Sequence, residues 1–359
     1  MTKKIEKRKE DHIELSLKDH VQYHKLKTGF DDVRLIYNAL PEMDFQEVDA
    51  STTILNKKLS YPMIFEAMTG GFSKAEKINK DLAQTAQKYG LAMGLGSQRA
   101  MLEDPKHINT YKVRDVAPDI PLIGNIGVVQ LIELYKNKKL NKIDDLVQKP
   151  ELDAIAVHLN PLQEIIQPEG EKHFKGGLEA ITALTYHLKK YDVKVIAKEV
   201  GSGISSEVAQ HLKIAGIVMI DVAGAGGTSW SKIEYNRGKG KVRGFEEFGI
   251  PTVASILMCH SYMPVIASGG VRSGIDVTKS IVLGAEIAGA AQPFLAAQKQ
   301  KNLDKIVAEW AEQIKVSMFL VGAKNIPELK RKSYFLMGET KDSMLVNKVK
   351  MSKKDQLFM

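Results

Sequence analysis

Short apolar runs recur through the middle of the chain, and each run is bounded by residues that favour turns. Eight runs fall between residues 60 and 271, and each has the length and composition of a strand that is buried on both faces. They are Pro62 to Met68, Leu91 to Ser97, Pro121 to Gly127, Ala154 to Asn160, Val193 to Val200, Ile217 to Gly224, Thr252 to Leu257 and Pro264 to Gly270. Eight such strands in one unit predict a closed barrel.

Most intervals between these runs have the residue spacing of helices. Residues Ala75 to Tyr89, Leu178 to Tyr191 and Ser205 to Ile214 carry apolar side chains three and four positions apart. Strands that alternate with helices form a parallel sheet, so the predicted fold class is α/β, a (β/α)8 TIM barrel. The connection from Met258 to Met263 is short for a crossover. An open doubly wound sheet is the alternative, although such sheets more often carry a GxGxxG turn after the first strand, which this chain does not.

The segments around the barrel divide the chain into three parts. Residues 1–60 have the pattern of irregular structure with polar turns, and we expect this N-terminal extension to contribute to a substrate site. Residues 61–300 form the barrel. Residues 301–359 are predicted to form a C-terminal helix and tail packed on the barrel, because apolar residues recur at helical spacing from Asn302 to Ala323.

The composition is that of an ordinary globular protein, with 44% hydrophobic and 26% charged residues in 359. No uncharged apolar run approaches the roughly 18 residues that a membrane span needs, and the lysine-rich start has no apolar segment behind it. We therefore expect no membrane segment and a cytoplasmic location. The single cysteine, Cys259, fits a reducing compartment as a buried structural thiol, with a lone nucleophile as the alternative.

The charge balance does not choose a partner. The net charge of +8 could favour nucleic acid, an anionic membrane or phosphorylated metabolites. Part of the excess lies in residues 3–9 and 348–354, where solvated tails would explain it equally well.

Polar residues and glycines follow six of the predicted strands. The reacting groups of a (β/α)8 barrel lie at the carboxyl ends of its strands, so this recurrence predicts a site, although any one of these residues could be a turn former. The strand ends carry Ala67-Met68-Thr69-Gly70-Gly71, Ser97-Gln98-Arg99, Asn125, Gln163-Glu164, Lys198-Glu199 and Gly226-Gly227-Thr228. His158 and Asn160 share parity along one strand and would face the barrel interior, where a polar group needs a partner or a ligand.

A glycine-rich loop after the last predicted strand indicates a phosphate site. Ser268-Gly269-Gly270-Val271-Arg272-Ser273-Gly274 leads into a helical stretch, Ile275 to Leu283, and residues 288–292 follow. Glycines let backbone N–H groups approach an anion, and the helix directs its positive end toward it. A phosphate-bearing cofactor fits, and a tight turn is the alternative.

Cationic residues could hold a diphosphate at the same end of the barrel. Arg8, Lys9 and His12 lie within five residues of one another, and Arg99 follows the second strand. Arginine pairs bidentately with phosphate oxygens. Glu164 could hold Mg2+ against the diphosphate, although an exposed glutamate is the plain alternative.

These motifs together resemble the type 2, FMN-dependent family of isopentenyl-diphosphate isomerases. The resemblance rests on Arg8-Lys9-Glu10-Asp11-His12, Ala67 to Gly71, Gly96-Ser97-Gln98, His158-Leu159-Asn160 with Gln163-Glu164, Pro168-Glu169-Gly170, Lys198-Glu199-Val200-Gly201 and Gly226-Gly227-Thr228. It runs from Arg8 to Gly338-Glu339-Thr340, which is nearly the whole chain.

The resemblance implies specific roles. Reduced FMN and Mg2+ would serve isomerisation of isopentenyl diphosphate to dimethylallyl diphosphate, NAD(P)H would reduce the flavin, and the protein would be a homo-tetramer or homo-octamer without nucleic acid. FMN would contact Ala67, Met68, Thr69, Ser97, Asn125, Lys198, Thr228, Gly270, Val271, Arg272, Ala291 and Gln292. Substrate would contact Arg8, Lys9, His12, Ser97, Gln98, Arg99, His158 and Gln163, and Glu164 would bind the metal. Gln163 and Lys198 are the predicted catalytic residues; an amide is a poor base, so Gln163 would position substrate or proton.

Two other functions are weighed against this one. A flavin-dependent 2-hydroxy acid oxidoreductase would share the barrel but would require a histidine and arginine pair after strand six or seven, and no histidine lies between Asp221 and His260. A basic nucleic-acid-binding protein is the non-enzymatic alternative, supported by the charge alone.

Overall fold

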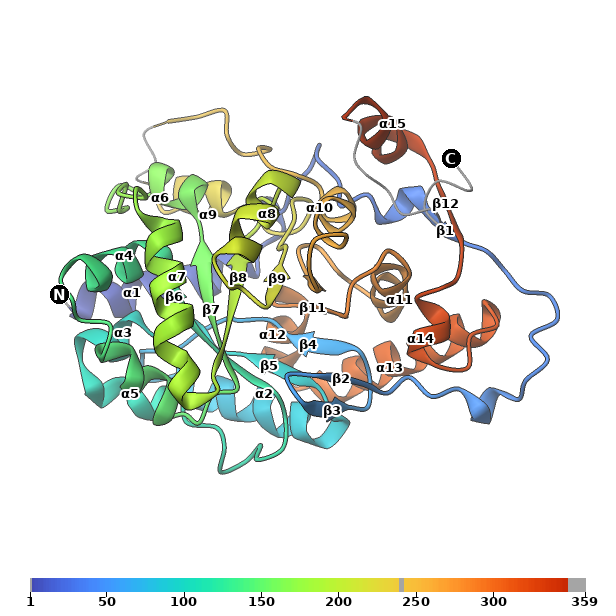
Figure 1. Cartoon of the computed structure of the whole chain (residues 1–359), viewed down its shortest axis with the longest axis horizontal. Helices are drawn as coiled ribbons and strands as arrows, with labels where there is room; N and C mark the ends of the chain where they lie inside the picture. The colour runs from blue at the N-terminus through green and yellow to red at the C-terminus, as the bar shows by residue number, and fades with distance from the viewer. Residues whose placement is uncertain (1, 239–241, 348–359) are drawn as a thin grey trace.

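A closed barrel of eight parallel strands forms the centre of the molecule (Figure 1). A computed structural model of the chain describes residues 2–238 and 242–347. The barrel strands, in chain order, are β4 (Met63–Phe65), β5 (Ala92–Gly94), β6 (Leu122–Gly127), β7 (Ala154–Leu159), β8 (Lys194–Glu199), β9 (Met219–Asp221), β10 (Val265–Ala267) and β11 (Ile287–Ala290). Strand β11 pairs with β4 and closes the sheet, so the predicted (β/α)8 barrel is confirmed.

One of the eight predicted strands is wrong. The run from Thr252 to Leu257 belongs to helix α10 (Thr252–Cys259), and the eighth strand is β11 instead. Helix α10 is buried over nearly its whole length, so it lacks the polar face that reveals a helix in a sequence. The glycine-rich loop therefore follows the seventh barrel strand, and Ala291 and Gln292 follow the eighth.

Helices and short turns connect the strands around the barrel. They are α2 (Ala75–Tyr89), α3 (Arg99–Glu103), α4 (Val128–Lys136), α5 (Lys142–Gln148), α6 (Pro161–Ile166), α7 (Gly177–Leu188), α8 (Ser206–Ile214), α9 (Trp230–Asn236), α11 (Gly274–Val282) and α12 (Gln292–Lys299). Leucine, isoleucine and valine fill the layer between strands and helices. A second cluster of buried apolar side chains, which includes Ile64, Ile123, Ile196 and Ile266, fills the barrel interior.

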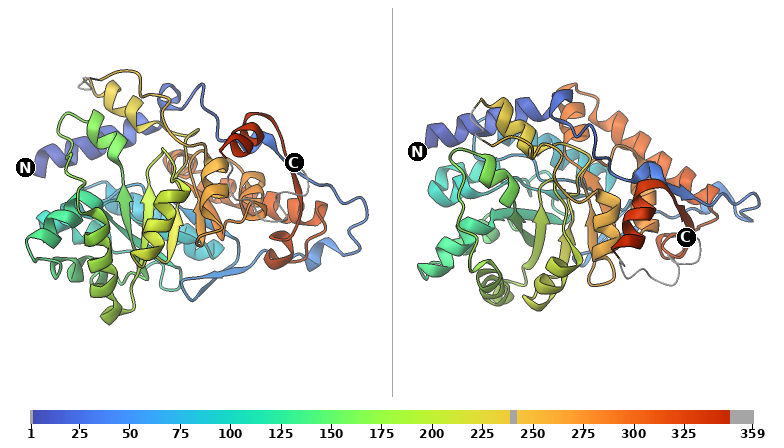
Figure 2. Two further views of the ribbon diagram at one scale, coloured as in Figure 1. Left: turned by 45° about the horizontal axis from the view of Figure 1, so that its top comes forward. Right: turned by 90° about the horizontal axis from the view of Figure 1, so that it is seen from above.

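The N-terminal extension begins with a helix, so the expectation of irregular structure is wrong for its first part. Helix α1 (Thr2–Ser16) contacts α9, and the two helices lie side by side in both views of Figure 2. Its sequence is mostly polar, and its few apolar residues, Ile5, Ile13 and Leu15, form no continuous stripe, which hid the helix, although lysine, glutamate and arginine are good helix formers. The rest of the extension contains β1 (Val33–Leu35) and the hairpin of β2 (Thr52–Ile54) and β3 (Lys57–Leu59).

The C-terminal segment joins the N-terminal extension. The closing helix is α13 (Leu303–Leu320), which packs on α11, α12 and α2, and it is followed by α14 (Ile326–Leu329), β12 (Tyr334–Leu336) and α15 (Gly338–Val346). Strand β12 pairs antiparallel with β1, so Val33 lies opposite Leu336 (Figure 1). The predicted tail beyond residue 347 lies outside the described residues.

Cys259 is a buried structural residue in this fold. Its Sγ donates to the carbonyl oxygen of Ile204 at 3.3 Å, and burial raises the pKa of the thiol to about 12. A thiol that stays protonated is a poor nucleophile.

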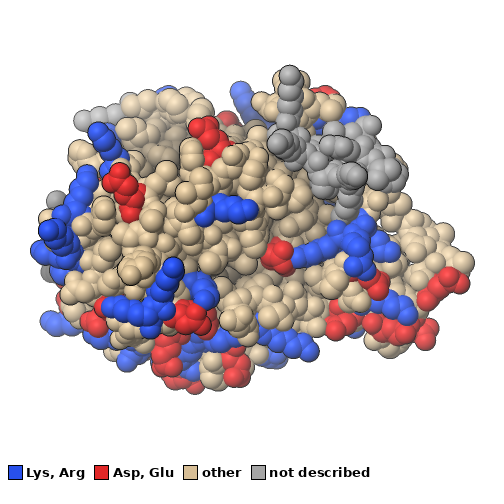
Figure 3. All heavy atoms as spheres, in the orientation of Figure 1, with Lys and Arg blue, Asp and Glu red and all other residues tan. Residues whose placement is uncertain are grey.

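Charged side chains of both signs mix along the lower edge of the face shown in Figure 3, while the middle of this face is largely uncharged. Among the described residues visible on this face, Lys and Arg side chains do not form one continuous surface. Among the residues that the structure describes, no helix is both long enough and apolar enough to cross a membrane.

An ion-pair cluster fastens the β2–β3 hairpin to the amino ends of the barrel strands. Asp153 accepts from Lys57 Nζ at 3.0 Å, from Arg114 Nη2 at 2.7 Å and from the backbone N–H of Leu122 at 2.8 Å. We expect Asp153→Ala to lower the free energy of unfolding by about 2 kcal/mol, because these are charge-assisted bonds in a half-buried site. Urea unfolding of the purified protein measures this loss. Lys142→Ala, which removes a lysine outside this cluster, is the control, and an equal loss in the two variants would contradict the assignment.

Candidate functional site

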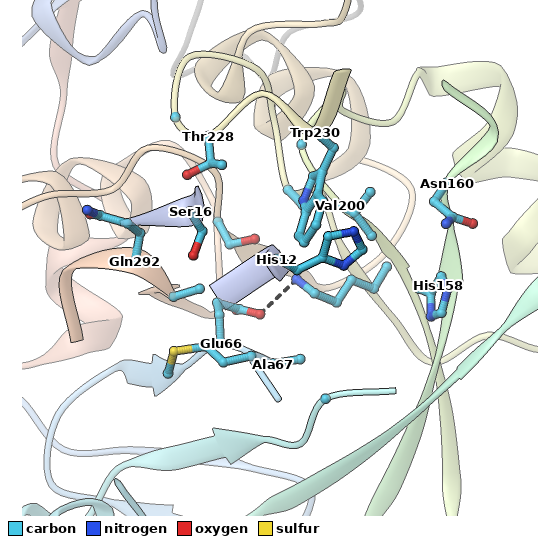
Figure 4. A pocket seen from close by; sticks show the side chains of 18 of the residues that line it. His12, Ser16, Glu66, Ala67, His158, Asn160, Val200, Thr228, Trp230 and Gln292 are labelled. Carbon is cyan, nitrogen blue, oxygen red and sulfur yellow. Dashed lines mark hydrogen bonds and ion pairs between the residues drawn. The ribbon is translucent and has the colours of Figure 1, made fainter. Parts of the chain in front are cut away.

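A large cavity opens at the carboxyl ends of the barrel strands, and α1 forms part of its wall (Figure 4). All but one of the residues predicted for the site line this cavity. They are Arg8, Lys9, His12, Ala67, Met68, Thr69, Ser97, Arg99, Asn125, His158, Gln163, Glu164, Lys198, Thr228, Gly270, Val271, Arg272, Ala291 and Gln292. Segments that are up to 284 positions apart in the sequence thus meet around one space.

Gln98 is the exception, and its predicted contact with substrate is corrected. Its side chain is fully buried and is not part of the cavity wall. The amide oxygen accepts from the backbone N–H of Asn125 at 3.0 Å, and the amide nitrogen donates to the carbonyl oxygen of Leu146 at 2.8 Å. Gln98 therefore holds the strand β6 residue Asn125 in place behind the wall.

The cations on one side of the cavity already have protein partners. Lys9 Nζ donates to the carbonyl oxygens of Gly70 and of Ser97, the latter at 3.0 Å, and to the hydroxyl of Tyr111 at 3.3 Å. Burial, and then the nearby Arg8 guanidinium, lower the pKa of Lys9 to about 7. An anion bound here would restore the charged ammonium, because an opposite charge favours the ionised form.

Arg99 lies on the same side of the cavity and is paired with two glutamates. Its Nε is 2.9 Å from Glu103 Oε1, and its Nη2 is 2.9 Å from Glu171 Oε1. A diphosphate that uses this guanidinium would share it with Glu103 or displace Glu171.

The predicted metal ligand lies beside two amides. Glu164 Oε1 accepts from Asn160 Nδ2 at 3.0 Å, and Glu164 Oε2 accepts from the backbone N–H of Glu171 at 2.7 Å. Asn160 Nδ2 also donates to Gln163 Oε1 at 3.0 Å. The described part of the chain contains no cluster of three or more His, Cys, Asp or Glu side chains arranged for a metal, so a cation here would rely on one carboxylate and on ligand oxygens.

Glu66, Lys198 and Asp221 form a buried trio of charges, of which Glu66 and Lys198 line the cavity and Asp221 lies behind them. Lys198 Nζ donates to Glu66 Oε2 at 2.7 Å and to Asp221 Oδ2. Burial alone would lower the pKa of Lys198, but the two carboxylates, Asp221 first, raise it, so the ammonium is charged. The sequence prediction included Lys198 and missed Glu66, which precedes the Ala67-Met68 motif.

A second buried carboxylate was also missed. Glu234 on α9 has a fully buried side chain, and its Oε1 lies 2.9 Å from His12 Nε2 and 3.4 Å from Gln163 Nε2. Arg237 Nη1 donates to its other oxygen at 2.5 Å. His12 also packs edge-on against Trp230, with ring centroids 5.1 Å apart, and Figure 4 shows the two rings together at the cavity.

The glycine-rich loop forms a cradle that only glycine can provide. Gly269 and Gly270 have φ of +97° and +68°, and a Cβ on Gly270 would lie 2.5 Å from Thr28 Cγ2. Both glycines line the cavity, and α11 begins four residues after Gly270. Nearby, the Arg272 guanidinium donates to Gln22 Oε1 at 3.2 Å. This is the geometry of a backbone anion site with an arginine beside it.

Two buried polar atoms in the wall are available to hydrogen-bond a ligand. Within the described residues, Thr69 Oγ1 and Glu66 Oε1 have no hydrogen-bond partner. Buried polar atoms are nearly always paired, so a bound molecule with its own donors and acceptors would satisfy them.

Sequence comparison finds relatives along the whole chain. Isopentenyl-diphosphate delta-isomerase of Pyrococcus abyssi is 43% identical over 354 residues, covering 94% of each chain. The enzymes of the same name from Methanothrix thermoacetophila and from Nostoc sp. are 44% and 42% identical, and they cover 94% and 90% of this chain and 94% and 93% of their own lengths.

Two further comparisons concern the fold and the cofactor class. The family model described as FMN-dependent dehydrogenase matches residues 178–335, which include the glycine-rich loop. The solved structure of a lactate oxidase from Pediococcus acidilactici superposes with a TM-score of 0.64 at 16% identity, covering 94% of both chains. A mandelate oxidase superposes with a TM-score of 0.61 at 17% identity, covering 91% of this chain and 92% of its own. At such low identity these structures support the fold alone.

Proposed function

Since the chain belongs to the isopentenyl-diphosphate delta-isomerase family of enzymes, we propose that it converts isopentenyl diphosphate to dimethylallyl diphosphate with the help of reduced FMN and Mg2+. The observation that carries this proposal is that a glycine cradle, Lys198 and the cations Arg8, Lys9 and Arg99 all line one cavity. One end suits a phosphate-bearing cofactor and the other suits a diphosphate.

The residues present fit FMN. The cradle of Gly269 and Gly270, with Arg272, would hold the phosphate, and Ala291 and Gln292 at the start of α12 would complete that end. The remaining predicted contacts would surround the ring. They are Ala67, Met68, Thr69, Ser97, Asn125, Lys198 and Thr228. The unpaired Thr69 Oγ1 supports this assignment, because the flavin ring offers it a partner.

The substrate would bind between this cofactor and α1. Arg8, Lys9 and Arg99 would hold the diphosphate, and His12, Ser97, His158 and Gln163 would contact the rest of the substrate. The pKa of His158 is lowered to about 4 by burial and by the Lys198 charge, so this imidazole is neutral at pH 7. Its Nδ1 lies 2.7 Å from Asn125 Oδ1, which fixes the ring and makes it a hydrogen-bond donor or acceptor to ligand rather than a counter-ion.

The reaction needs one proton delivered to the terminal carbon and another removed near the diphosphate end. When bound, reduced FMN supplies an electron-rich ring that stabilises developing positive charge. Burial opposes ionisation of Glu234, but the hydrogen bond from His12 and the Arg237 charge lower its pKa, so this carboxylate is charged. We assign to Glu234 the orientation of His12 and of the Gln163 amide, through which a proton near the substrate can be held or moved.

One assay tests the proposed function directly. Purified protein, loaded with FMN and incubated anaerobically with isopentenyl diphosphate and Mg2+, should form dimethylallyl diphosphate only after the flavin is reduced. Turnover with oxidised flavin, or none with reduced flavin, would overturn the proposal. Consumption of a 2-hydroxy acid with oxygen would favour the oxidoreductase alternative. That alternative requires a histidine after β9 or β10, whereas the histidines in the described cavity wall, His12 and His158, come from α1 and β7.

The metal assignment gives a separate prediction. We expect Glu164→Gln to raise the Mg2+ concentration needed for half-maximal activity at least about tenfold, because it removes the single carboxylate of the site, while FMN remains bound. An activity titration with Mg2+ measures this change. Glu103→Gln, which leaves Glu164 intact, is the control, and an unchanged Mg2+ requirement in Glu164→Gln would show that the metal binds elsewhere.

Three expectations stay predictions. They are NAD(P)H as the reductant of the flavin, assembly into a homo-tetramer or homo-octamer, and a cytoplasmic location. Spectroscopic reduction of the bound flavin with each nicotinamide and the mass of the particle in solution would test the first two.

A further inference from the structure

The buried trio of Glu66, Lys198 and Asp221 has an unbalanced charge. If both carboxyl groups are ionised, two negative charges face the one positive charge of Lys198, and the trio carries one net negative charge. All three side chains are at least nine-tenths buried. An uncompensated charge in such a place is expensive, so one of the two carboxyl groups is expected to hold a proton.

The hydrogen bonds identify which carboxyl group holds it. Besides Lys198, Asp221 accepts from Ser268 Oγ at 2.5 Å and from the backbone N–H of Ala223 at 3.3 Å, so both of its oxygens have donors. Glu66 Oε2 accepts from Lys198, its Oε1 has no donor among the described residues, and the neighbouring Asp221 carboxylate raises the pKa of Glu66. Donors stabilise the ionised form of a carboxyl group, so Glu66, which has fewer donors, is the group that takes the proton.

Glu66 also lies at a boundary between the cavity and a dry layer. It lines the main cavity and, on its other side, a small hollow walled by Ile64, Ile123 and Ile196. Figure 4 shows the Glu66 side chain at the cavity, and its Oε2 accepts from Lys198 Nζ. The electrostatic interaction between a new charge in the cavity and the Glu66 carboxyl group is therefore not weakened by water on the inner side of Glu66.

We propose that in alkaline solution, in which Glu66 is ionised beside the oxidised flavin, Glu66 takes up a proton from solvent when the flavin is reduced, so that its neutralisation offsets the charge gained by the cofactor. The inference rests on the proposed function, because it needs FMN beside Lys198. A hydride from a nicotinamide carries two electrons and one proton to the flavin and leaves the reduced flavin with a negative charge. The further proton goes to the Glu66 carboxylate, which becomes the neutral acid, and nothing else is oxidised or reduced.

The surroundings set the pH range of this uptake. Burial and then the Asp221 charge raise the pKa of Glu66 to about 8, against the opposing effect of Lys198. Asp221 on β9 and Lys198 on β8 are the charged groups that act on the Glu66 carboxyl, while the backbone N–H of Glu66 donates to the carbonyl oxygen of Ala290 on β11 at 3.1 Å. Another negative charge in the cavity would raise this pKa further. Below pH 8 Glu66 is already protonated with oxidised flavin, so extra uptake is expected above pH 8.

The test is a redox titration of the FMN-loaded protein against a dye of known potential from pH 6 to 10. For the native protein we expect reduction to take up about one proton per two electrons at pH 6 and nearly two above pH 8. The second proton makes the flavin potential fall by about 30 mV more for each pH unit, which is a tenfold change in the equilibrium constant for reduction. Glu66→Gln should stay near one proton throughout. Equal proton counts in the two proteins would overturn the inference.

Two further measurements make the result specific. Glu199 is a neighbouring buried carboxylate that accepts from three backbone N–H groups and lies outside the cavity wall. The Glu199→Gln variant should therefore take up as many protons as the native protein. Loss of the second proton in this variant too would contradict the role of Glu66. In infrared difference spectra, reduction above pH 8 should produce a carboxylic-acid C=O band that is absent from Glu66→Gln. Protein that binds FMN but shows neither effect refutes only this inference, whereas protein that binds no FMN refutes the proposed function as well.

Discussion

Lys198→Met should lower the free energy of unfolding by about 3–5 kcal/mol at pH 8, because it leaves two buried carboxyl groups without their shared counter-charge. The side chains of Glu66 and Asp221 are 6% and 3% exposed, so water cannot replace the ammonium. Methionine fills a similar volume, so little of the loss comes from packing. We also expect the variant to bind FMN poorly.

The pH dependence of this loss separates charge from shape. Burial and the Asp221 charge raise the folded-state pKa of Glu66 to about 8 in the native protein, and loss of the opposing Lys198 charge raises it further. The destabilisation relative to the native protein therefore grows as the pH rises above 8. Urea unfolding at pH 8 and pH 10 measures the difference, and an equal loss at both values would contradict the explanation.

Two variants serve as controls for Lys198→Met. Adding Glu66→Gln should recover part of the stability, because one buried charge is removed. Lys194→Met, on the same strand, breaks an exposed pair with Asp192 and should cost at most about 1 kcal/mol.

Glu234→Gln should reduce kcat by about 100-fold to 10,000-fold, the range for loss of a group that controls proton transfer. The amide cannot accept a proton, and it leaves Arg237 without a buried counter-charge. Glu234 does not line the cavity, so FMN should remain bound and the substrate KM should change little. Single-turnover rates with reduced flavin measure the effect.

The control for this variant lies on the same arginine. Glu169→Gln removes a partly exposed partner of Arg237, at 2.7 Å from Nη2, and leaves His12 and Gln163 untouched. A small change in kcat is expected there. If Glu234→Gln raised KM and left kcat unaltered, Glu234 would be a binding residue rather than part of the proton path.

Strand positions and the glycine cradle could be predicted because their physical causes are local. Buried parallel strands are continuous apolar runs, and the glycines at 269 and 270 are required by backbone angles and close contacts. The confusion of α10 with a strand has the opposite cause. Burial on every side removes the periodicity by which a helix is distinguished from a strand, and only the tertiary fold decides.

The missed carboxylates differ in how visible they were. Glu66 shares parity with Ile64 on β4, so a charged residue facing inward could have been read from the alternation of that strand. Glu234 gives no such signal, because it lies on a helix after β9 rather than at a strand end, and only the fold brings it to His12. The same limit applies to Gln98, whose motif was correct but whose side chain turns behind the wall.

The pairing of β1 with β12 has a consequence for synthesis. Residues 33–35 leave the ribosome early, yet their partner, residues 334–336, is translated some 300 positions later. Until then, the extension that carries Arg8, Lys9 and His12 lacks the strand that fixes its far end, and such distant contacts form slowly. A nascent chain should therefore complete its barrel before its substrate pocket, and a truncation that ends before residue 334 should keep secondary structure while losing catalytic competence.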